Sequence, residues 1–326
     1  MAEPTRIAAT ARTVRFGAFD ASFPPVATVD PGDTVVLECV SGAPEAMPGP
    51  GTGLRVPEAL AAIHAADPPR MGPHIITGPV AVRGAEPGDV LRIDILAIEP
   101  GADWGFCGFR PLFGTLPEDF PYARMLHIPV DRAAGTATIP MMVREGGGGI
   151  TLPLAPFFGV MGVAPPPEWG RISTKEPRAH GGNLDNKELV AGTTLFLPVH
   201  VAGAMFSAGD GHGMQGDGEV CINALEMCLT GTFRLGVEKG GGASDPALRF
   251  PRAETPTHYV TMGLNEDLDL AMKGALREMI AFIASRTNLS PADAYQFCSL
   301  AVDFRVTQTV NGEKGVHGML RKGLIF

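Results

Sequence analysis

The stretch that decides the fold is PVAVRGAEPGDVLRIDIL, residues 79–96. Pro-Gly-Asp at 87–89 interrupts two apolar runs, and a proline followed by a glycine that accepts a positive φ is what a type II turn requires. After this turn, Leu91, Ile93 and Ile95 alternate with their neighbours, and a period of two indicates a half-buried β-strand. The segment therefore predicts a strand, a tight turn and a second strand.

Two further segments have the same outline. PVATVDPGDTVVLEC (25–39) carries the same Pro-Gly-Asp turn, and LVAGTTLFLPVHVAGAMF (189–206) leads directly into a glycine-rich stretch. Short β-branched runs separated by glycine and proline are typical of sandwiches and barrels. We predict a β-rich α+β fold with antiparallel β-sandwich or jelly-roll-like sheets.

Helices are expected only late in the chain. Apolar residues recur with the 3.6-residue period over 266–286, and Ser290 followed by a proline predicts a second helix over 291–302. The short connection between them predicts a helical hairpin, after which the chain returns to strand with a turn at Asn311-Gly312. We expect a β-rich domain over 1–230 and an α+β portion over 231–326, or one continuous domain.

Composition excludes several classes of protein. The 326 residues are 45% hydrophobic and 19% charged, an ordinary globular balance. The net charge is −9 and the chain has no basic cluster, so we expect no nucleic-acid partner. The 5 cysteines form no CxxC pair, which argues against a disulfide framework and a thiolate zinc site and fits a reduced compartment.

Neither the N-terminus nor the uncharged stretch 150–167 predicts membrane insertion. The N-terminus, MAEPTRIAATARTVRFG, lacks the apolar core of a signal peptide. Ile150 to Pro167 is uncharged, but its prolines would break a spanning helix. We interpret this stretch as a buried or pocket-lining loop and expect a cytoplasmic protein without a membrane partner.

The glycine-rich stretch FSAGDGHGMQGDGE (206–219) is the first candidate site. Three familiar motifs do not fit it. A dinucleotide fingerprint over 211–216 lacks basic residues and a βαβ frame, and an EF-hand would need glycine where Gln215 stands. A nitrilase-like site that recruits Cys221 has no other support.

A metal or acid–base site is the interpretation that remains. Asp210 and His212 are one residue apart, so on an extended backbone they project to the same side. Imidazole and carboxylate are ligands of catalytic zinc, and Glu219 follows closely enough to fold back as a base. On charge alone, a plain hairpin turn with solvated acids is equally favoured.

A second candidate site lies upstream, in RAHGGNLD at 178–185. Its paired glycines before an amide and a carboxylate indicate a backbone that passes close to a polar group. The alternative is an Asx turn leading into the next strand.

These motifs resemble one known family. GGNLD (181–185) and GDGHGMQGDGE (209–219) are similar to segments of the acetamidase/formamidase family, amide hydrolases that release ammonia. Three more segments match in family order, at 77–100, 156–165 and 294–320. The resemblance implies a β-rich fold, a homodimer and hydrolysis of a linear C–N bond other than a peptide bond. It also implies a divalent metal, zinc in preference to calcium, and a small-molecule amide substrate.

A set of site residues follows for such an enzyme. We predict Asp210, His212, His180 and Asp185 as metal ligands. Glu219 is the predicted acid–base residue, Asn183 a donor to the carbonyl oxygen, and Asp217 a residue that orients its neighbours. Without a metal, Asp210 and Glu219 would drive a carboxylate-based reaction.

Two histidines and one other class of protein remain as alternatives. His317 and His74 are further candidates for the site, and each is also compatible with a structural role. The competing class is a non-enzymatic β-sandwich binding protein whose Asp/Gly loop holds a structural metal. His212 argues against it, because calcium prefers oxygen ligands.

Overall fold

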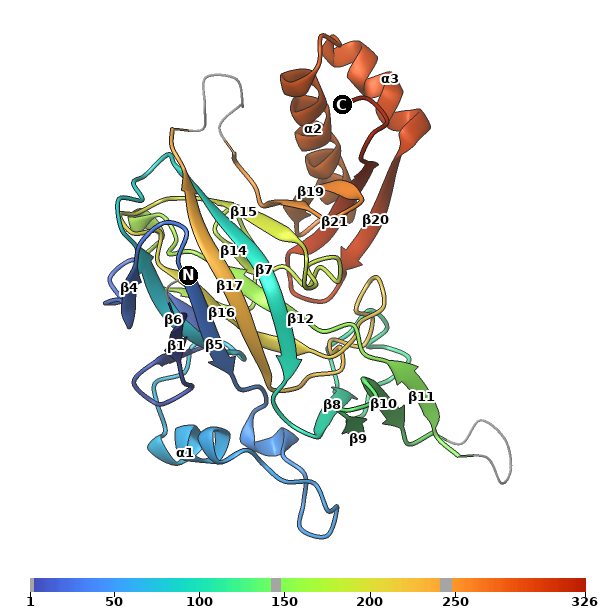
Figure 1. Ribbon diagram of the computed structural model, residues 1–326. Coiled ribbons are helices and arrows are strands. Elements are labelled where there is room, and N and C mark those ends of the chain that lie inside the picture. Colours follow the sequence, from blue (N-terminus) through green and yellow to red (C-terminus); the bar gives the residue numbers. More distant parts are fainter. Residues whose placement is uncertain (1–2, 142–147, 241–247) are drawn as a thin grey trace.

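The computed structural model describes residues 3–141, 148–240 and 248–326, and two sheets dominate it (Figure 1). The larger sheet has nine strands in the order β1 (Thr5–Ile7), β5 (Thr34–Cys39), β17 (Leu229–Glu238), β7 (Val90–Pro100), β15 (Thr194–Pro198), β18 (Arg252–Glu254), β19 (His258–Asn265), β21 (Lys314–Arg321) and β20 (Val302–Gln308). The second has six strands, β14 (Gly181–Asn183), β12 (Phe157–Gly162), β16 (Phe206–His212), β6 (Ile75–Val82) and β2 (Val14–Phe16), with β4 (Ala27–Val29) paired to β6.

Smaller elements complete the fold. A four-stranded sheet has the order β11 (Ile150–Pro153), β10 (Thr136–Ile139), β9 (Arg124–Asp131) and β8 (Trp104–Phe109), and β13 (Ile172–Ser173) pairs with β3 (Ala18–Phe19). The helices are α1 (Glu58–Ala66), α2 (Leu268–Arg286) and α3 (Pro291–Ala301), with 3₁₀ turns at Pro44–Ala46 and Pro167–Trp169. Among the described strand pairs only β1–β5 and β4–β6 are parallel. The predicted β-rich α+β fold is confirmed.

The strand–turn–strand units connect the two layers. Strand β4 belongs to the six-stranded sheet and β5 to the nine-stranded sheet, and β6 and β7 are divided in the same way. The Pro-Gly-Asp turns between them place Gly32 at φ 96° and Gly88 at φ 92°, the left-handed region that glycine tolerates. Each predicted turn is confirmed, and it carries the chain from one layer of the sandwich to the other.

Aromatic side chains fill the space between the layers. Phe233 of β17 packs against Phe158 of β12 and Phe206 of β16, with ring centroids 5.6 Å and 5.5 Å apart. All three rings are fully buried. Burial of such a side chain stabilises a fold by about 1.5–3 kcal/mol, so this contact fixes the six-stranded sheet against its partner.

Two segments differ from the sequence prediction. The early helix α1 is not predicted by the sequence pattern. Its buried face consists of Leu60 and Ile63, and one such pair three residues apart is too weak a signal for a helix. The stretch 150–167, expected as a buried or pocket-lining loop, contains strands β11 and β12, and it is buried over β12 but largely exposed over β11. Strand β12 lacks an alternating pattern because both of its faces are covered, as in central strands generally.

The late helical hairpin is confirmed. Ser290 and Asp293 form a capping box at the start of α3, and Gly263 of β19 lets α2 approach the sheet closely, because a Cβ there would meet the Ala271 carbonyl oxygen.

Among the described residues, no helix combines the length and apolar character needed to span a bilayer.

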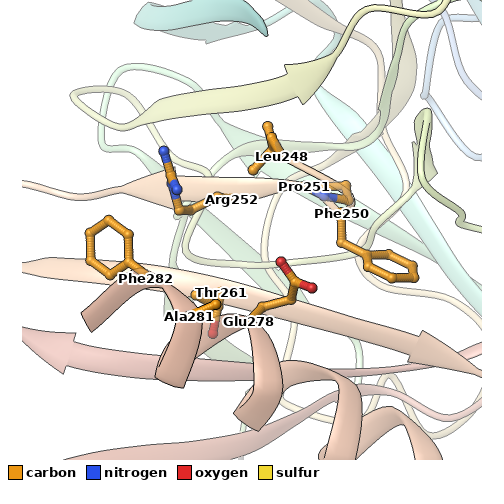
Figure 2. Close-up of a pocket in the computed structure, with 8 residues that line it drawn as sticks. All are labelled: Leu248, Phe250, Pro251, Arg252, Thr261, Glu278, Ala281 and Phe282. Atoms are coloured by element: carbon orange, nitrogen blue, oxygen red, sulfur yellow. The ribbon is translucent and has the colours of Figure 1, made fainter. Parts of the chain in front are cut away.

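A small cavity of about 10 Å³ lies between α2 and strands β18 and β19, far too small for a substrate (Figure 2). Arg252 and Phe282 lie next to each other at one end of it, with the guanidinium 4.9 Å from the ring centroid. The expected domain boundary at 230 and 231 falls inside β17, and the nine-stranded sheet takes strands from both portions. This continuity favours one domain.

Asp94 in the middle of the large sheet offers a test of the fold. It accepts hydrogen bonds from Arg234 at 2.7 Å, Thr194 at 2.8 Å and Arg92 at 3.0 Å. Burial acts to raise the pKa of Asp94, but these three donors outweigh burial and lower it. A carboxyl with a lowered folded-state pKa stabilises the fold above its unfolded pKa, and this stability is lost as the pH falls through the folded-state pKa.

We expect Asp94→Asn to lower the free energy of unfolding by about 1–2 kcal/mol at neutral pH. The difference from the wild type should begin to shrink as the pH falls below about 4, where the carboxyl of the unfolded chain takes up a proton, and should vanish once the pH is below the lowered folded-state pKa. Urea unfolding at several pH values measures this, with the exposed Asp303→Asn as control. A difference that is constant with pH would contradict the role of Asp94.

Candidate active site

Strand β16 carries the centre of the site. It was expected as part of a flexible loop, but Phe206–His212 is a fully buried strand within the six-stranded sheet. Its glycines are required by packing, because a Cβ on Gly209 would lie 2.3 Å from the Ile75 carbonyl oxygen and one on Gly211 would lie 2.4 Å from that of Met227. Asp210 and His212 are therefore held on a rigid element.

The first cluster of the site surrounds the His212 ring. Nε2 of His212 lies 3.3 Å from Asp210 Oδ2 and 3.3 Å from Glu226 Oε1. A second group joins His212 to Asp185 and Glu219, and within each group the potential ligand atoms lie within 4.8 Å of one another. Four carboxylates thus converge on one imidazole.

Sequence reasoning missed Glu226. After His212 the chain makes an excursion through Asp217 and Glu219 and returns antiparallel to itself, so that Glu226 forms a β-bridge with His212. The backbones of Glu226 and Phe106 also exchange two hydrogen bonds, since each N–H donates to the other residue's carbonyl oxygen at 2.8 Å. A lone carboxylate inside the apolar run ALEMCL (224–229) is the signal that could have identified it.

Gln215 orients the imidazole. Its Nε2 donates to the Asp185 carbonyl oxygen at 2.7 Å, so its Oε1 faces His212 Nδ1 at 3.0 Å. A proton on Nδ1 satisfies this contact and leaves the lone pair of Nε2 directed at the carboxylates. A hydrogen bond of this kind to the outer nitrogen sets the tautomer of a metal-binding histidine.

Three of the carboxylates stand on strained backbone. Asp185 has φ 46°, Asp210 φ 55° and Glu219 φ 46°, in the left-handed region that side chains rarely adopt. Strain of this kind costs on the order of 1–3 kcal/mol per residue and is common at functional sites, where surrounding structure holds it. The surrounding sheet therefore holds these side chains in place.

Gly159 of β12 makes room for the cluster. A Cβ at this position would lie 2.4 Å from Asp185 Oδ1, 2.5 Å from Asp210 Oδ2 and 2.8 Å from His212 Cε1. A methyl group cannot be accommodated at these distances, so the site requires glycine here.

The buried charges shift one another's ionisation. Burial raises the pKa of Asp185 and of Glu226, and burial together with the charge of Asp185 raises the pKa of Glu219 well above its usual value. Burial opposes protonation of His212, yet the charges of Glu226 and Asp210 raise its pKa well above the usual value. The cluster holds four acidic groups around one imidazole, so full ionisation would leave it with excess negative charge.

Two further side chains support the carboxylates. His74 Nε2 lies 3.7 Å from Asp210 Oδ2, and Asn311 donates to Asp185 Oδ2. Burial opposes ionisation of Asp210, but the charges of His74 and His212 lower its pKa. Of the two extra histidines weighed from the sequence, His74 reaches the cluster, whereas the buried His317 bonds to Thr307 Oγ1 at 2.7 Å.

The remaining sequence candidates lie in different surroundings. Asn183 is buried, its amide donates to the Lys175 carbonyl oxygen at 3.4 Å, and its Oδ1 has no described partner. The Asp217 side chain is 35% exposed and pairs with Lys187 at 3.1 Å. These positions bring Asn183, but not the Asp217 carboxylate, towards the cluster.

His180 is fully buried, but within the described residues it belongs to neither group of potential ligands. Its ring packs edge-on against Phe19 at 5.0 Å and Trp169 at 6.1 Å. Burial lowers the pKa of His180 to about 3, which keeps the ring neutral.

A cavity of about 850 Å³ opens onto the cluster. Asp210, Glu219, Glu226 and Asn183 form part of its lining, together with aromatic side chains of β8 and the loop that follows it. A concave site with convergent polar groups on an apolar wall is the usual form of an active site.

Comparison with known proteins agrees with this architecture. The formamidase of Methylophilus methylotrophus is 29% identical to this chain over 345 aligned residues, which cover 90% of this chain and 79% of that protein. A crystal structure of an acetamidase from Bacillus halodurans matches with a TM-score of 0.80 and 32% identity, over 97% of each chain. A predicted acetamidase/formamidase from Thermoanaerobacter tengcongensis matches with a TM-score of 0.80 and 26% identity, over 98% of this chain and 96% of that one.

The sequence model of one family covers nearly the whole chain, at residues 3–173 and 169–313. The resemblance inferred from GGNLD and GDGHGMQGDGE is confirmed, and this chain belongs to the Acetamidase/Formamidase family.

Proposed function

We propose that the cluster around His212 hydrolyses the C–N bond of small linear amides to a carboxylate and ammonia. The family and its formamidase and acetamidase members identify the chain as an amidase that acts on C–N bonds other than peptide bonds. The observation that supports this site is the convergence of four buried carboxylates and one imidazole beside a cavity of about 850 Å³. An activated water molecule is the nucleophile that such a set of groups can produce.

The donor set fits a divalent cation. His212 Nε2 is buried without a described hydrogen-bond partner and lies 3.3 Å from both Asp210 Oδ2 and Glu226 Oε1. Gly159 leaves the space beside Asp210 Oδ2 and the His212 ring free of side-chain atoms. We assign Asp210, His212 and Glu226 as ligands. A bound divalent ion supplies Lewis acidity, which lowers the pKa of water and polarises a carbonyl group.

The choice of ion and the ligands follow from the chemistry of the donors. An imidazole with carboxylates is typical of zinc, whereas calcium is bound by oxygen alone. His180 is left out of the ligand set because Phe19 and Trp169 surround it. Asp185 is proposed to position the site, since Asn311 occupies one of its oxygens and its backbone N–H bonds to Gly159.

The chain's own residues move the protons and hold the amide. Glu219 Oε2 takes a proton from the attacking water and returns it to the departing nitrogen, because this oxygen is unpartnered and Glu219 lines the cavity. One N–H of the Asn183 amide bonds to Lys175, which leaves the other to donate to the carbonyl oxygen as negative charge develops there. Asp217 has no assigned step because its carboxylate pairs with Lys187.

Two expectations from the sequence concern the surroundings of the enzyme. A homodimer remains our proposal, and the exposed apolar side chains of Leu112, Leu116 and Phe120 offer a surface for a second copy. The cytoplasmic location also remains a prediction. The competing non-enzymatic binder would hydrolyse no amide, so ammonia release from formamide and acetamide distinguishes the two classes.

Replacing Glu219 tests the acid–base role. We expect Glu219→Gln to lower kcat by about 10²–10⁴-fold, because the amide cannot accept the proton from water. Asp217→Asn, in the same glycine-rich excursion, should leave kcat nearly unchanged. Ammonia release and bound metal are measured for both variants. Full activity of Glu219→Gln with its metal retained would exclude Glu219 as the base.

Replacing Gly159 tests the geometry of the cluster. We expect Gly159→Ala to displace the carboxylates of Asp185 and Asp210, with at least about a 10²-fold loss of activity and less bound metal. Gly216→Ala is the matched control, because a Cβ at Gly216 meets nothing within 4 Å. If Gly159→Ala binds metal and hydrolyses amides as the wild type does, the proposed arrangement is wrong.

Removal of metal tests the cation itself. We expect exhaustive chelation to abolish ammonia release and to lower the melting temperature, since the carboxylates then repel one another. Addition of zinc should restore both. Metal content is measured alongside activity, and activity that persists in metal-free protein would favour the carboxylate-driven reaction of Asp210 and Glu219.

A further inference from the structure

The cavity is much larger than the smallest amides require. A water molecule occupies roughly 30 Å³ in the liquid, so acetamide, with four non-hydrogen atoms, needs on the order of 100 Å³. The cavity measures about 850 Å³, within the range of pockets that hold drug-sized ligands. Most of its volume is therefore available to parts of a substrate distant from the amide.

The walls above the cluster are apolar. Phe106 is buried next to the carboxylates, and Phe109 and Phe113 are half-buried further out. Met71 and Met125 complete this wall near the solvent, where they are 52% and 40% exposed. Such a wall binds an alkyl or aryl chain rather than a polar one.

The mouth of the cavity carries cationic side chains. Arg110 and Arg124 are solvent-exposed and line the cavity, and the half-buried Lys175 lies on its wall. The Arg110 guanidinium lies 4.1 Å from the centre of the Phe113 ring, and among the described residues neither arginine forms an ion pair with a carboxylate. Glu45 is the one acidic residue in the lining outside the buried cluster. The outer cavity is therefore positive, whereas its floor is negative.

Strand β8 sets the distance between the two regions. Its residue Phe106 is bridged to Glu226 of the cluster, and Phe109 is paired with Arg124 of β9. The three residues from Phe106 to Phe109 span about 10 Å at the rise of an extended strand. The backbone at Phe109 and Arg124 thus lies on the order of 10 Å along the strand from the bridge to Glu226, and the exposed Arg110 and Arg124 belong to this outer end.

We propose that the preferred substrate is a linear amide with an apolar acyl chain that ends in an anionic group, on the order of 10 Å from the carbonyl carbon. This inference rests on the proposed amidase function. Arg110 and Arg124 bind the anion, the phenylalanine and methionine side chains contact the chain, and the amide lies at the buried cluster. A carboxylate or phosphate matches the planar fork of a guanidinium group. Acetamide fills only the floor of the cavity.

Suberamic acid, the monoamide of suberic acid, tests this proposal against its own methyl ester, which has the same chain without the charge. We expect kcat/KM for suberamate to exceed that for the ester by about tenfold, and added salt to reduce the difference. Succinamic acid has the charge on a chain that is too short to reach the arginines, so it should gain little.

Variants identify the residues responsible. Arg124→Gln and Arg110→Gln should each raise KM for suberamate severalfold and leave kcat/KM for acetamide unchanged. Arg132→Gln is the matched control, because Arg132 lies just beyond β9, faces Asp103 at 3.8 Å and does not line the cavity. Equal losses with suberamate and its ester would indicate a structural effect and contradict recognition of the anion.

The outcomes separate this inference from the proposed function. Hydrolysis of acetamide with no preference for suberamate over its ester would overturn the inference and leave the amidase assignment intact. If the wild type hydrolyses no amide at all, the proposed function fails. In that case the binding of suberamate and of its ester to the Glu219→Gln variant, measured by calorimetry, decides the inference by itself. Equal affinities for the two compounds contradict it. Tighter binding of suberamate supports it, provided that the difference is lost when Arg124→Gln is added to the variant.

Discussion

Four carboxylates and one imidazole share a small buried volume, and the repulsion among these negative charges is the constraint on which the site depends. Asp185, Asp210, Glu219 and Glu226 are each at most 6% exposed, so water screens them little. Uncompensated buried charge costs several kcal/mol per ion. In the proposed site a cation at the His212 ring would offset most of that cost, so the same residues would serve both binding and stability.

The sandwich provides the rigidity that this arrangement requires. Left-handed backbone at three carboxylate positions is unfavourable in isolation and persists because neighbouring strands hold it. Strand β12 contributes Phe158 to the core between the sheets and Gly159, the next residue, to the site. The same strand therefore contributes both to the packing between the sheets and to the geometry of the site. A substitution that weakens the packing of β12 would also displace the side chains around Gly159.

The two ends of the cavity have different physical roles. Its floor is buried, and in the proposed mechanism the low dielectric there would strengthen the interactions that act on the amide. Its mouth is exposed, so charges there are screened and, under the same proposal, would contribute mainly to the choice and capture of substrate. Helices α2 and α3 pack on β19, β20 and β21, and none of their residues lines the cavity. They support the large sheet rather than the chemistry.

Local patterns predicted the elements well. The Pro-Gly-Asp turns, the alternation in β7 and the capping box of α3 each depend on residues a few positions apart, and all three occur in the structure. A nine-residue helix with two buried side chains left too weak a pattern, and strand β12 lost its alternation because both faces are covered. Short or doubly covered elements are identified by their tertiary environment.

The sequence by itself determined the strand–turn–strand units, the late helices and the pairing of Asp210 with His212, because residues two apart on an extended backbone project to the same side whatever surrounds them. Only the tertiary structure added Glu226 to the cluster, selected His74 over His317, and placed His180 among aromatic rings. Strand pairing brings residues that are far apart in the sequence into contact, and no local sequence pattern indicates which of them will form that contact. The reason is physical: local conformation depends on adjacent residues, whereas the composition of a buried site depends on how distant strands pack.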